Sequence, residues 1–370
     1  MRGMFIFAVG VLLLFAAYVY YFILRSARFW LPKVRKGAAA LLAALVLACL
    51  IAITVLAVQW LLIVLFYVML ASIVIDAVGL PLKRILPEKP TGKWECIRKS
   101  GLLPVTAAVL FMVFGYFNIY NVHVTEYRLE TAKHIRPQGY RVALISDLHF
   151  GLTFDDAKLR EYCADISARE PDVVILCGDI VDERTTAEEM RAAFEALGEI
   201  KSACGIFYVI GNHDVLNYAR APAFTEMELM RTIEENGIVV LRDSLYAVND
   251  ELTLIGRDDI SENRSRKATA EILGGEERAK YLLLLDHQPL GFAENAAAGA
   301  DLQLSGHTHN GQIWPLAHFY EPLGTADLAY GHVKLNDFQA IVSSGIAGWG
   351  YPFRTQGISE YVIIDIHKAE

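Results

Sequence analysis

Tyr140-Arg141-Val142-Ala143-Leu144-Ile145 leads directly into Ser146-Asp147-Leu148-His149 and then Phe150-Gly151. The apolar run predicts a buried β-strand, and Gly151 predicts the turn that ends it. Because side chains at i and i+2 share one face of a strand, Asp147 and His149 are expected to project together. Open α/β sheets bind ligands at the carboxyl ends of their strands, and a carboxylate beside an imidazole suits a divalent transition metal. Taken alone, the same residues also fit an ordinary surface loop.

The two parts of the 370-residue chain differ in charge. Residues 1–124 hold 12 of the 34 Lys and Arg but only 3 of the 42 Asp and Glu, which gives a net charge of +9. The remaining residues carry a net charge of −17 and are numerous enough to bury their own core. An acidic second part argues against a nucleic-acid partner, because binding to a phosphate backbone requires a basic surface.

Four apolar stretches of 21 residues each precede the acidic part: Met4–Leu24, Ala38–Val58, Trp60–Leu80 and Leu102–Val122. At about 1.5 Å per residue, each would span roughly 31 Å as a helix, enough to cross a hydrocarbon core of about 30 Å. Helices buried in a soluble core are the alternative, but these are rarely so long and so free of charge. Residues 1–122 are therefore predicted to form four transmembrane helices of a multi-pass protein of the cell membrane, with the lipid bilayer as a partner.

Basic residues in the loops predict how these helices are oriented. The loop before the fourth stretch carries six basic residues against two acidic ones, and the first loop has no acid beside Arg25, Arg28, Lys33, Arg35 and Lys36. The positive-inside rule places both loops in the cytoplasm. The N-terminus and everything after Val122 are then expected on the other side, so the acidic part is predicted to be extracytoplasmic.

Asp76 lies inside the third apolar stretch. An ionisable group in a membrane span is a functional candidate by default. Its position near the cytoplasmic end favours a simpler interpretation, in which it snorkels toward the interface or pairs with Lys83 and Arg84.

Residues 123–139 are polar and predict a connector with one strand over His123–Leu129. Residues 140–370 alternate between strand-like and helix-like patterns and predict an α/β domain. Helices are expected over Asp156–Glu170, Ala187–Ser202 and Ala223–Asn236. Further strands are expected over Val173–Cys177, Ile206–Ile210, Ile238–Leu241, Leu245–Val248, Leu252–Ile255, Tyr281–Leu285, Leu302–Leu304, Gln339–Ser344 and Tyr361–Ile366.

Five predicted strands each end in a cluster of Asp, Asn or His. After the first cluster, Asp147-Leu148-His149, the others are Gly178-Asp179-Ile180-Val181-Asp182, Gly211-Asn212-His213-Asp214, Asp286-His287 and Gly306-His307-Thr308-His309. Any one of these clusters could consist of ordinary polar residues without a function. Five such clusters at the ends of five predicted strands are too many for that explanation. Strand ends gathered at one rim of a sheet would bring these side chains together, and the glycines would let the backbone turn tightly there.

These clusters resemble the calcineurin-like metallophosphoesterases, whose pattern is Asp-x-His, Gly-Asp-x-x-Asp, Gly-Asn-His-Asp/Glu, an isolated His and Gly-His-x-His. All five blocks occur in order across about residues 140–312. Ser344-Gly345-Ile346-Ala347-Gly348 and Pro352-Phe353-Arg354 look like the end of the bacterial membrane-associated or exported branch, which often has Gly where this chain has Asn310. The resemblance implies that a calcineurin-like metallophosphoesterase α/β sandwich follows the four predicted transmembrane helices, with the catalytic domain over residues 140–370. The transmembrane region itself is not part of the general family pattern.

The resemblance also implies a centre of two divalent metal ions. One ion would bind Asp147, His149 and His309, the other would bind Asn212, His287 and His307, and Asp179 would bridge both. The donor types support this independently, because oxygen donors mixed with imidazoles suit Mn, Fe or Zn better than Ca or Mg. Two such ions about 3.5–4 Å apart can share a hydroxide and clamp both oxygens of an in-line displacement at phosphorus.

The remaining polar residues of the blocks receive roles from the same resemblance. His213 would act near the leaving oxygen, as a general acid or as a transition-state stabiliser, and Asp182 would orient it. Asp214 is a weaker candidate for orienting His213. Its alternative role is to hold the turn in which it lies. Asp286 either orients a neighbouring imidazole or is a turn residue, and Arg257-Asp258-Asp259 is expected to be a solvated turn.

The predicted function is a membrane-anchored, metal-dependent phosphohydrolase that acts on phosphate mono- or diesters or on pyrophosphates. Proximity to the bilayer favours a lipid-linked phosphate such as a glycolipid pyrophosphate, with cell-wall polymers and soluble nucleotides as alternatives. Trp314, Trp349, Tyr351 and Phe353 fit an apolar wall for a lipid, a membrane-facing rim or ordinary loop packing. The competing function is a non-catalytic membrane sensor or scaffold that retains the fold, and the complete set of ligand residues argues against it.

Overall fold

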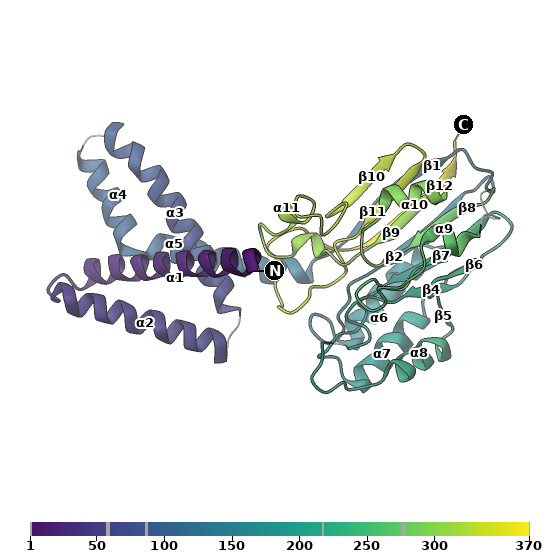
Figure 1. Ribbon diagram of the computed structural model, residues 1–370, viewed down its shortest axis with the longest axis horizontal. Helices are drawn as coiled ribbons and strands as arrows, with labels where there is room; N and C mark the ends of the chain where they lie inside the picture. Colours follow the sequence, from purple (N-terminus) through teal and green to yellow (C-terminus); the bar gives the residue numbers. More distant parts are fainter. Residues whose placement is uncertain (1, 57–59, 86–87, 217, 275–278, 370) are drawn as a thin grey trace. The chain divides into compact units, whose positions relative to one another are not determined.

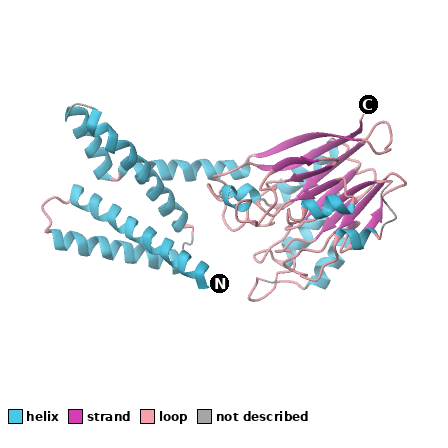
Figure 2. Ribbon diagram, turned by 45° about the horizontal axis from the view of Figure 1, so that its top comes forward, coloured by secondary structure: helices cyan, strands magenta, loops and turns pink. Residues whose placement is uncertain are grey.

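The chain consists of two compact units, Met1–Phe114 (unit 1) and Gly115–Glu370 (unit 2). A computed structural model describes residues 2–56, 60–85, 88–216, 218–274 and 279–369. Among these residues, unit 1 is built from helices, and every strand belongs to unit 2 (Figure 2).

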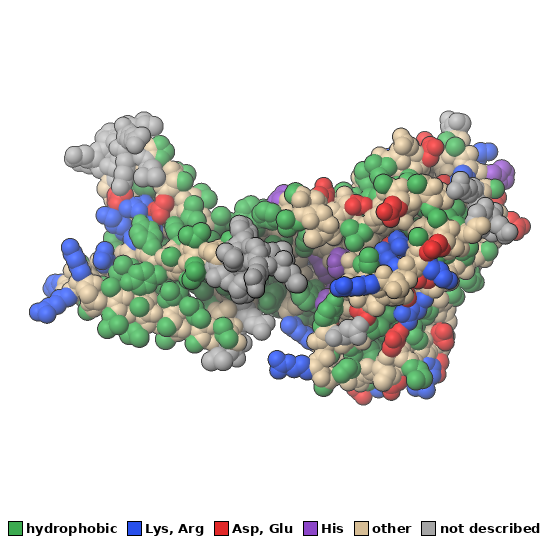
Figure 3. Space-filling view, in the orientation of Figure 1, with side chains coloured by type: hydrophobic (Ala, Val, Ile, Leu, Met, Phe, Trp, Pro, Cys, Tyr) green, Lys and Arg blue, Asp and Glu red, His purple; other side chains and the backbone are tan. Residues whose placement is uncertain are grey.

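Unit 1 contains the four predicted apolar helices. Its helices are α1 (Arg2–Trp30), α2 (Lys36–Leu56), α3 (Leu61–Ile85), α4 (Glu88–Ser100) and the first part of α5 (Leu102–Tyr120). Within the described part of the chain, four segments are long and apolar enough to cross a membrane, and these are Gly10–Trp30, Lys36–Val55, Leu61–Gly79 and Leu102–Tyr120. Only 11–22% of the residues in these segments are buried, and Figure 3 shows many hydrophobic groups on the surface of unit 1, as expected for helices that face lipid. The polar helix α4 was not predicted.

Asp76 on α3 is held by two arginines from other helices. Arg25 on α1 donates two hydrogen bonds from Nη1 to the Asp76 carboxylate, at 2.9 and 2.7 Å. Arg98 on α4 donates a third at 3.2 Å. The predicted partners Lys83 and Arg84 have side chains outside the described part of the structure. Asp76 therefore joins three helices of unit 1, which gives this partly buried charge a structural task.

Unit 2 is built on two six-stranded mixed sheets that face each other (Figure 1). The first sheet has the order β1-β12-β2-β3-β4-β5, and the second has the order β10-β11-β9-β8-β7-β6. The strands are β1 (Val122–Thr131), β2 (Tyr140–Ile145), β3 (Val173–Cys177), β4 (Ile206–Val209), β5 (Ile238–Val240), β6 (Ser244–Ala247), β7 (Leu252–Gly256), β8 (Tyr281–Leu285), β9 (Leu302–Ser305), β10 (Gly331–Leu335), β11 (Phe338–Val342) and β12 (Ser359–Lys368).

The alternation of side chains along the central strands creates a four-layer sandwich. In β2, Leu144 lies in the core between the two sheets, while its neighbour Ala143 lies in the core under the helices. Helices α6 (Asp156–Ala168), α7 (Ala187–Gly198) and α8 (Glu226–Glu235) cover the outer face of the first sheet. The short helices α9 (Thr269–Leu273) and α10 (Phe292–Ala298) cover the second sheet. The predicted α/β sandwich is confirmed.

The segment predicted as a connector takes part in the fold of unit 2. Its expected strand is present as β1, which pairs in parallel with β12 from Val122 to Thr131 at the edge of the first sheet. The ordered unit thus begins before residue 140. The strand β10 and the short helices α9, α10 and α11 (Ala317–Tyr320) were not predicted, because they are too short to show a periodic pattern.

The last six residues of α5 also belong to unit 2. Ile119 is fully buried. Asn118 donates hydrogen bonds from Nδ2 to the carbonyls of Arg354 and Gly357, at 3.1 and 2.9 Å. The Ser359 hydroxyl donates to the carbonyl of Ile119 at 2.8 Å. The end of this apolar helix is therefore fixed to the C-terminal loop that precedes β12.

We predict that Asp76→Asn destabilises the protein by about 3 kcal/mol, because Arg25 would keep its charge in a buried position without a counter-ion. The Arg25 side chain is only 7% exposed. The thermal midpoint of the detergent-solubilised protein measures the effect, and Asp250→Asn, the same change at an exposed position, is the matched control. An unchanged midpoint for Asp76→Asn would refute this role.

Candidate metal centre

The five polar clusters lie together where the strands of both sheets end. Asp147 and His149 follow β2, however, and do not lie within it, since β2 ends at Ile145. Both have backbone conformations in the left-handed region, with φ of 53° and 41°. The predicted convergence of the two side chains therefore occurs through a loop and not through strand alternation.

The same unusual conformation recurs at three other candidate ligands. Asp179, His307 and His309 have φ of 53°, 70° and 50°. A residue with a Cβ atom adopts this region rarely and at a cost of about 1 kcal/mol or more. Backbone strain of this kind persists where the surrounding contacts enforce it, and it concentrates at functional sites.

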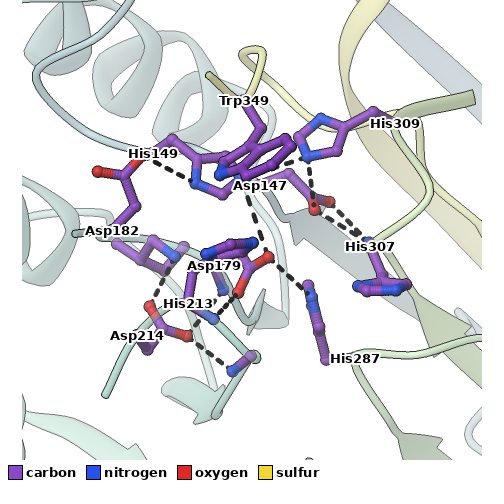
Figure 4. Close-up of polar contacts among 12 residues, drawn as sticks. Asp147, His149, Asp179, Asp182, His213, Asp214, His287, His307, His309 and Trp349 are labelled. Atoms are coloured by element: carbon purple, nitrogen blue, oxygen red, sulfur yellow. Dashed lines mark hydrogen bonds and ion pairs between the residues drawn. The ribbon is translucent and has the colours of Figure 1, made fainter. Parts of the chain in front are cut away.

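Asp147, His149 and His309 form the first group of potential metal ligands, and their ligand atoms all lie within 4.8 Å of one another (Figure 4). The Nε2 atoms of the two histidines face each other at 3.2 Å, and His309 Nε2 lies 3.4 Å from Asp147 Oδ1. Two imidazole nitrogens that point at one location beside a carboxylate provide a donor set for a transition metal.

Asp179, His287 and His307 form the second group within the same limit. His287 Nδ1 lies 2.8 Å from the carbonyl oxygen of Cys177. Because a carbonyl only accepts, Nδ1 carries the proton, and the lone pair of Nε2 is left for a metal. Asp179 Oδ2 lies 3.1 Å from this Nε2 and 3.8 Å from Nε2 of His149 in the first group. Asp179 thus lies between the two groups, where a bridging ligand is needed.

Asn212 completes the predicted set. Its side chain is buried, and Oδ1 has no hydrogen-bond partner among the described residues. The next residue, His213, donates its backbone N–H to Asp179 Oδ1 at 2.9 Å, which holds this loop against the bridging carboxylate. A buried amide oxygen without a partner is uncommon in folded proteins. The seven predicted ligands therefore fit two divalent ions by donor type and burial.

Two of the predicted glycines are required by close approaches at this centre. Gly178 has a φ of 77°, and a Cβ atom there would lie 2.6 Å from His287 Nδ1. A Cβ atom on Gly306 would lie 2.3 Å from Asp147 Oδ2. Both positions need glycine because any side chain would displace a candidate ligand.

The electrostatic surroundings keep several candidate ligands in the forms that bind metals. Burial opposes ionisation of Asp179, but the imidazoles of His287 and His149 outweigh it and hold its pKa well below the usual value. Burial raises the pKa of Asp147, an effect that His287 counters in part. Burial and neighbouring imidazoles lower the pKa of His307 to about 3 and that of His309 well below its usual value. Neutral imidazoles and ionised carboxylates are the metal-binding forms, so these shifts favour metal binding at Asp179, His307 and His309. The raised pKa of Asp147 acts the other way, as does that of His287, which the charge of Asp179 raises well above its usual value in spite of burial.

His213 is oriented by a residue that the sequence analysis did not select. Its Nδ1 lies 2.6 Å from Glu183 Oε1, whereas the carboxylate of Asp182 lies 3.4 Å from His149 Nδ1. Asp182 is turned that way because its Oδ1 accepts the backbone N–H of Arg184 at 2.8 Å. Burial lowers the pKa of His213, but the hydrogen bond to Glu183 and the charges of Asp179, Glu183 and Asp182 together raise it above its usual value. The structure thus replaces Asp182 by Glu183 as the direct partner of His213.

Asp214 holds the turn, which is the alternative that the sequence analysis left open. Its carboxylate accepts four backbone N–H groups, from Asp179 at 2.7 Å, Ile180 at 2.9 Å, Val181 at 3.1 Å and Gly211 at 2.7 Å. Burial and the charge of Asp179 raise the pKa of Asp214 to about 6.

The region after β7 is buried and is not the solvated turn that was predicted. Asp259 is fully buried and accepts hydrogen bonds from the Gln288 side chain at 2.9 and 3.0 Å. Asp286 binds Arg257 at 3.2 Å and Arg266 at 2.8 Å. Asp286 therefore anchors this loop through arginines, and neither of its predicted roles describes that contact.

Arg354 is a further residue that the sequence analysis did not assign to the centre. Its side chain is fully buried and donates hydrogen bonds to the carbonyls of His309 at 2.8 Å, Ser344 at 2.9 Å and Ala347 at 2.5 Å. Burial lowers its pKa to about 10, so the group stays positively charged at neutral pH. Arg354 therefore fixes the backbone of the candidate ligand His309 to the C-terminal loop. In the sequence, only its position in the family-like tail Pro352-Phe353-Arg354 indicated that it has a role.

Trp349 lies beside His213, and their ring centroids are 5.1 Å apart (Figure 4). Its side chain is 45% exposed. Of the other aromatic residues singled out in the sequence, Trp314 is exposed and Phe353 is buried. Loop packing therefore accounts for Phe353, whereas Trp349 forms an exposed edge of the centre.

Comparisons with known proteins agree with this geometry. The family profile described as calcineurin-like phosphoesterase matches residues 140–311. A transmembrane protein with metallophosphoesterase domain from Danio rerio is 29% identical over 62% of this chain, and this chain spans 54% of that relative. An uncharacterized metallophosphoesterase from Aquifex aeolicus (strain VF5) is 28% identical over 70% of this chain and 97% of its own length.

Among solved structures, the protein TT1561 of Thermus thermophilus aligns with a TM-score of 0.38 and 13% identity, over 56% of this chain and 91% of that one. This likeness is too weak to add to the assignment. The profile match covers all five polar clusters, from the strand that precedes Asp147 to His309. The chain therefore carries, over residues 140–311, a domain of the calcineurin-like phosphoesterase family.

Proposed function

We propose that unit 2 is a metal-dependent hydrolase of phosphoesters or phosphoanhydrides. The observation that carries the proposal is the pair of ligand groups with Asp179 between them. Such an arrangement suits two divalent ions, with Mn, Fe or Zn as the metals that the donor set favours. When bound, two ions activate water at neutral pH and stabilise negative charge on the phosphoryl group.

The residues of the chain would divide the remaining tasks among them. His213 would donate a proton to the leaving oxygen through Nε2, because Nδ1 is engaged by Glu183. Glu183 would hold the ring in place and stabilise its protonated form. Asp182 would orient His149 as a metal ligand. Trp349 would cover one side of His213 and exclude water from it.

The competing function is a membrane sensor or scaffold that retains the fold without catalysis. It would not need an oriented acid beside the metal groups, and the contact between His213 and Glu183 therefore favours the hydrolase. For the substrate we propose a lipid-linked phosphate, with soluble phosphoesters as the alternative. We further propose that unit 2 lies outside the cytoplasm, on the basis of the basic residues in the loops of unit 1.

Asp179→Asn should lower metal-stimulated hydrolysis of a chromogenic phosphodiester by at least a thousandfold, because both metal groups lose their shared carboxylate. The metal content of the purified protein, measured by mass spectrometry, should fall at the same time. Asp250→Asn removes the same charge from an exposed position and should change neither quantity. Removal of metal with a chelator should abolish turnover, and added Mn²⁺ should restore it. Activity that survives both treatments would refute the proposal.

Glu183→Gln should slow hydrolysis about a hundredfold for phenyl esters but much less for p-nitrophenyl esters, because only the poorer leaving group depends on a proton from His213. Asp182→Asn should instead weaken metal binding, since its carboxylate faces His149. Glu188→Gln, at an exposed position on α7, is the matched control. Equal losses for both leaving groups would assign Glu183 a merely structural role.

The side of the membrane can be tested with a reporter enzyme that is active only outside the cytoplasm. Fused after residue 370, it should be active, because the positive-inside rule places the basic loops in the cytoplasm. Fused after Lys33, in the first basic loop, it should be inactive. The opposite pattern would place unit 2 in the cytoplasm and leave the chemistry of the centre unaffected.

A further inference from the structure

Unit 2 exposes large apolar side chains around the end of α5. Three belong to α5 itself: Tyr116 is 48% exposed, Phe117 is 67% exposed and Tyr120 is 37% exposed. Four more lie on α11 and the loops beside it and before β12, and we call these the collar: Leu316 (46% exposed), Phe319 (50%), Leu323 (72%) and Trp349 (45%). A soluble surface rarely gathers so many exposed apolar groups without a partner.

The collar belongs to the same packed region as the end of α5. The loop before α11 is joined to the segment that holds the helix, because Trp314 N donates to Thr355 Oγ1 at 3.1 Å. Thr355 also touches α5, since a Cβ atom on Gly115 would lie 2.7 Å from its Cγ2 atom. Figures 1 and 2 both show α11 at the end of unit 2 where α5 enters.

The residues around α11 present one apolar face. Leu316, Phe319 and Leu323 follow the spacing i, i+3 and i+7. Phe319 N donates to the Leu316 carbonyl and Leu323 N to the Phe319 carbonyl, both at 3.0 Å, so helical turns extend beyond α11 and place the three residues on one side. The acidic residue of the segment, Glu321, binds the backbone N–H of Ala329 at 3.0 Å. The face therefore combines aliphatic and aromatic groups, the composition found where proteins enter the membrane–water interface.

The bilayer is the partner that fits this face. The segment Leu102–Tyr120 is apolar and long enough to span a membrane, and its final residues are fixed within unit 2. The segment around Thr355 contacts both the end of α5 and the loop before α11. The collar therefore lies beside the point at which the Leu102–Tyr120 span leaves the bilayer. This argument is independent of the side of the membrane on which unit 2 lies.

Trp349 connects the collar to the metal centre. Its ring lies 5.1 Å from that of His213, centroid to centroid, and its exposed part belongs to the collar. Gln312 fixes this loop, since Trp349 N donates to Gln312 Oε1 at 2.8 Å and Gln312 Nε2 donates to the Trp349 carbonyl at 3.1 Å. A single side chain thus separates the exposed apolar surface from the residue that we assign to the leaving oxygen.

We infer that the collar rests in the membrane interface and that the centre takes its phosphate from lipid headgroups at that surface. The substrate part of this inference rests on the proposed hydrolase function. In the reaction, water adds its hydroxyl to phosphorus, the bond between phosphorus and the leaving oxygen breaks, and a proton passes to that oxygen. The collar would hold the acyl chains of the substrate in the bilayer while the phosphate reaches His213.

The position of the collar can be tested without any turnover. A photoreactive benzoyl-phenylalanine is placed at Phe319, at Leu323 or at Met227, an exposed apolar position on α8 (79% exposed). The full chain is reconstituted in phosphatidylcholine vesicles, irradiated and analysed by mass spectrometry for lipid adducts. Adducts are expected at 319 and 323 and not at 227. Adducts absent from 319 and 323, or equal at all three positions, would overturn the inference.

The substrate class is tested with two esters that share one reacting group, methyl p-nitrophenyl phosphate in solution and hexadecyl p-nitrophenyl phosphate in phosphatidylcholine vesicles. The wild type should prefer the hexadecyl ester. The combined change Phe319→Asp and Leu323→Asp should lower the ratio of hexadecyl to methyl ester hydrolysis at least tenfold, and Met227→Asp should leave this ratio unchanged. An unchanged ratio, or a wild type that prefers the methyl ester, would overturn lipid selection.

The two arms separate the two proposals. If neither ester is hydrolysed by the metal-loaded wild type, the hydrolase proposal fails and the lipid headgroup substrate fails with it, while the photocrosslinking arm still decides whether the collar contacts the bilayer. If both esters are hydrolysed without selection and no lipid adducts form, the hydrolase stands and the collar inference is overturned.

Discussion

Asp179 is the side chain on which the arrangement of unit 2 depends. It is almost fully buried, it lies between two groups of imidazoles, and its backbone N–H is bound by Asp214. An ionised carboxylate in such a place is stable only with strong compensation. Part of the compensation comes from His287 and His149, and bound cations would supply more. The loops after β2, β3, β4, β8 and β9 all serve to bring compensating groups to this point.

Much of the fold could be predicted from the sequence, because long elements carry clear patterns. The strands β3 and β8 have the predicted bounds, and the four apolar helices stand where their composition indicated. The polar helix α4 and the short strand β10 were missed, since neither has a strong apolar period. Asp76 shows a second limit, because its partners Arg25 and Arg98 are distant in the chain and only the packing of helices brings them near.

The candidate site was predictable by residue type but not by contact. The block pattern selected the residues of both metal groups, yet it suggested Asp182 as the partner of His213 where the structure has Glu183. Adjacent acids cannot be told apart from sequence when a turn decides which one faces the ring. The role of Arg354 could not be predicted either. Its side chain binds backbone carbonyls, and no sequence pattern indicates which carbonyls will lie near it.

The left-handed conformations of Asp147, His149, Asp179, His307 and His309 have a consequence for the whole fold. The His307 N–H donates to Asp147 Oδ1 at 2.9 Å and so links loops that follow strands of the two sheets. The strain and the crowding of polar groups therefore destabilise the folded state as a whole. An ion that binds only the folded chain stabilises it by mass action, by about 2.7 kcal/mol at a concentration one hundred times its dissociation constant. Metal supply would then govern how long the protein survives proteolysis in the cell, and a metal-starved cell would contain less of it.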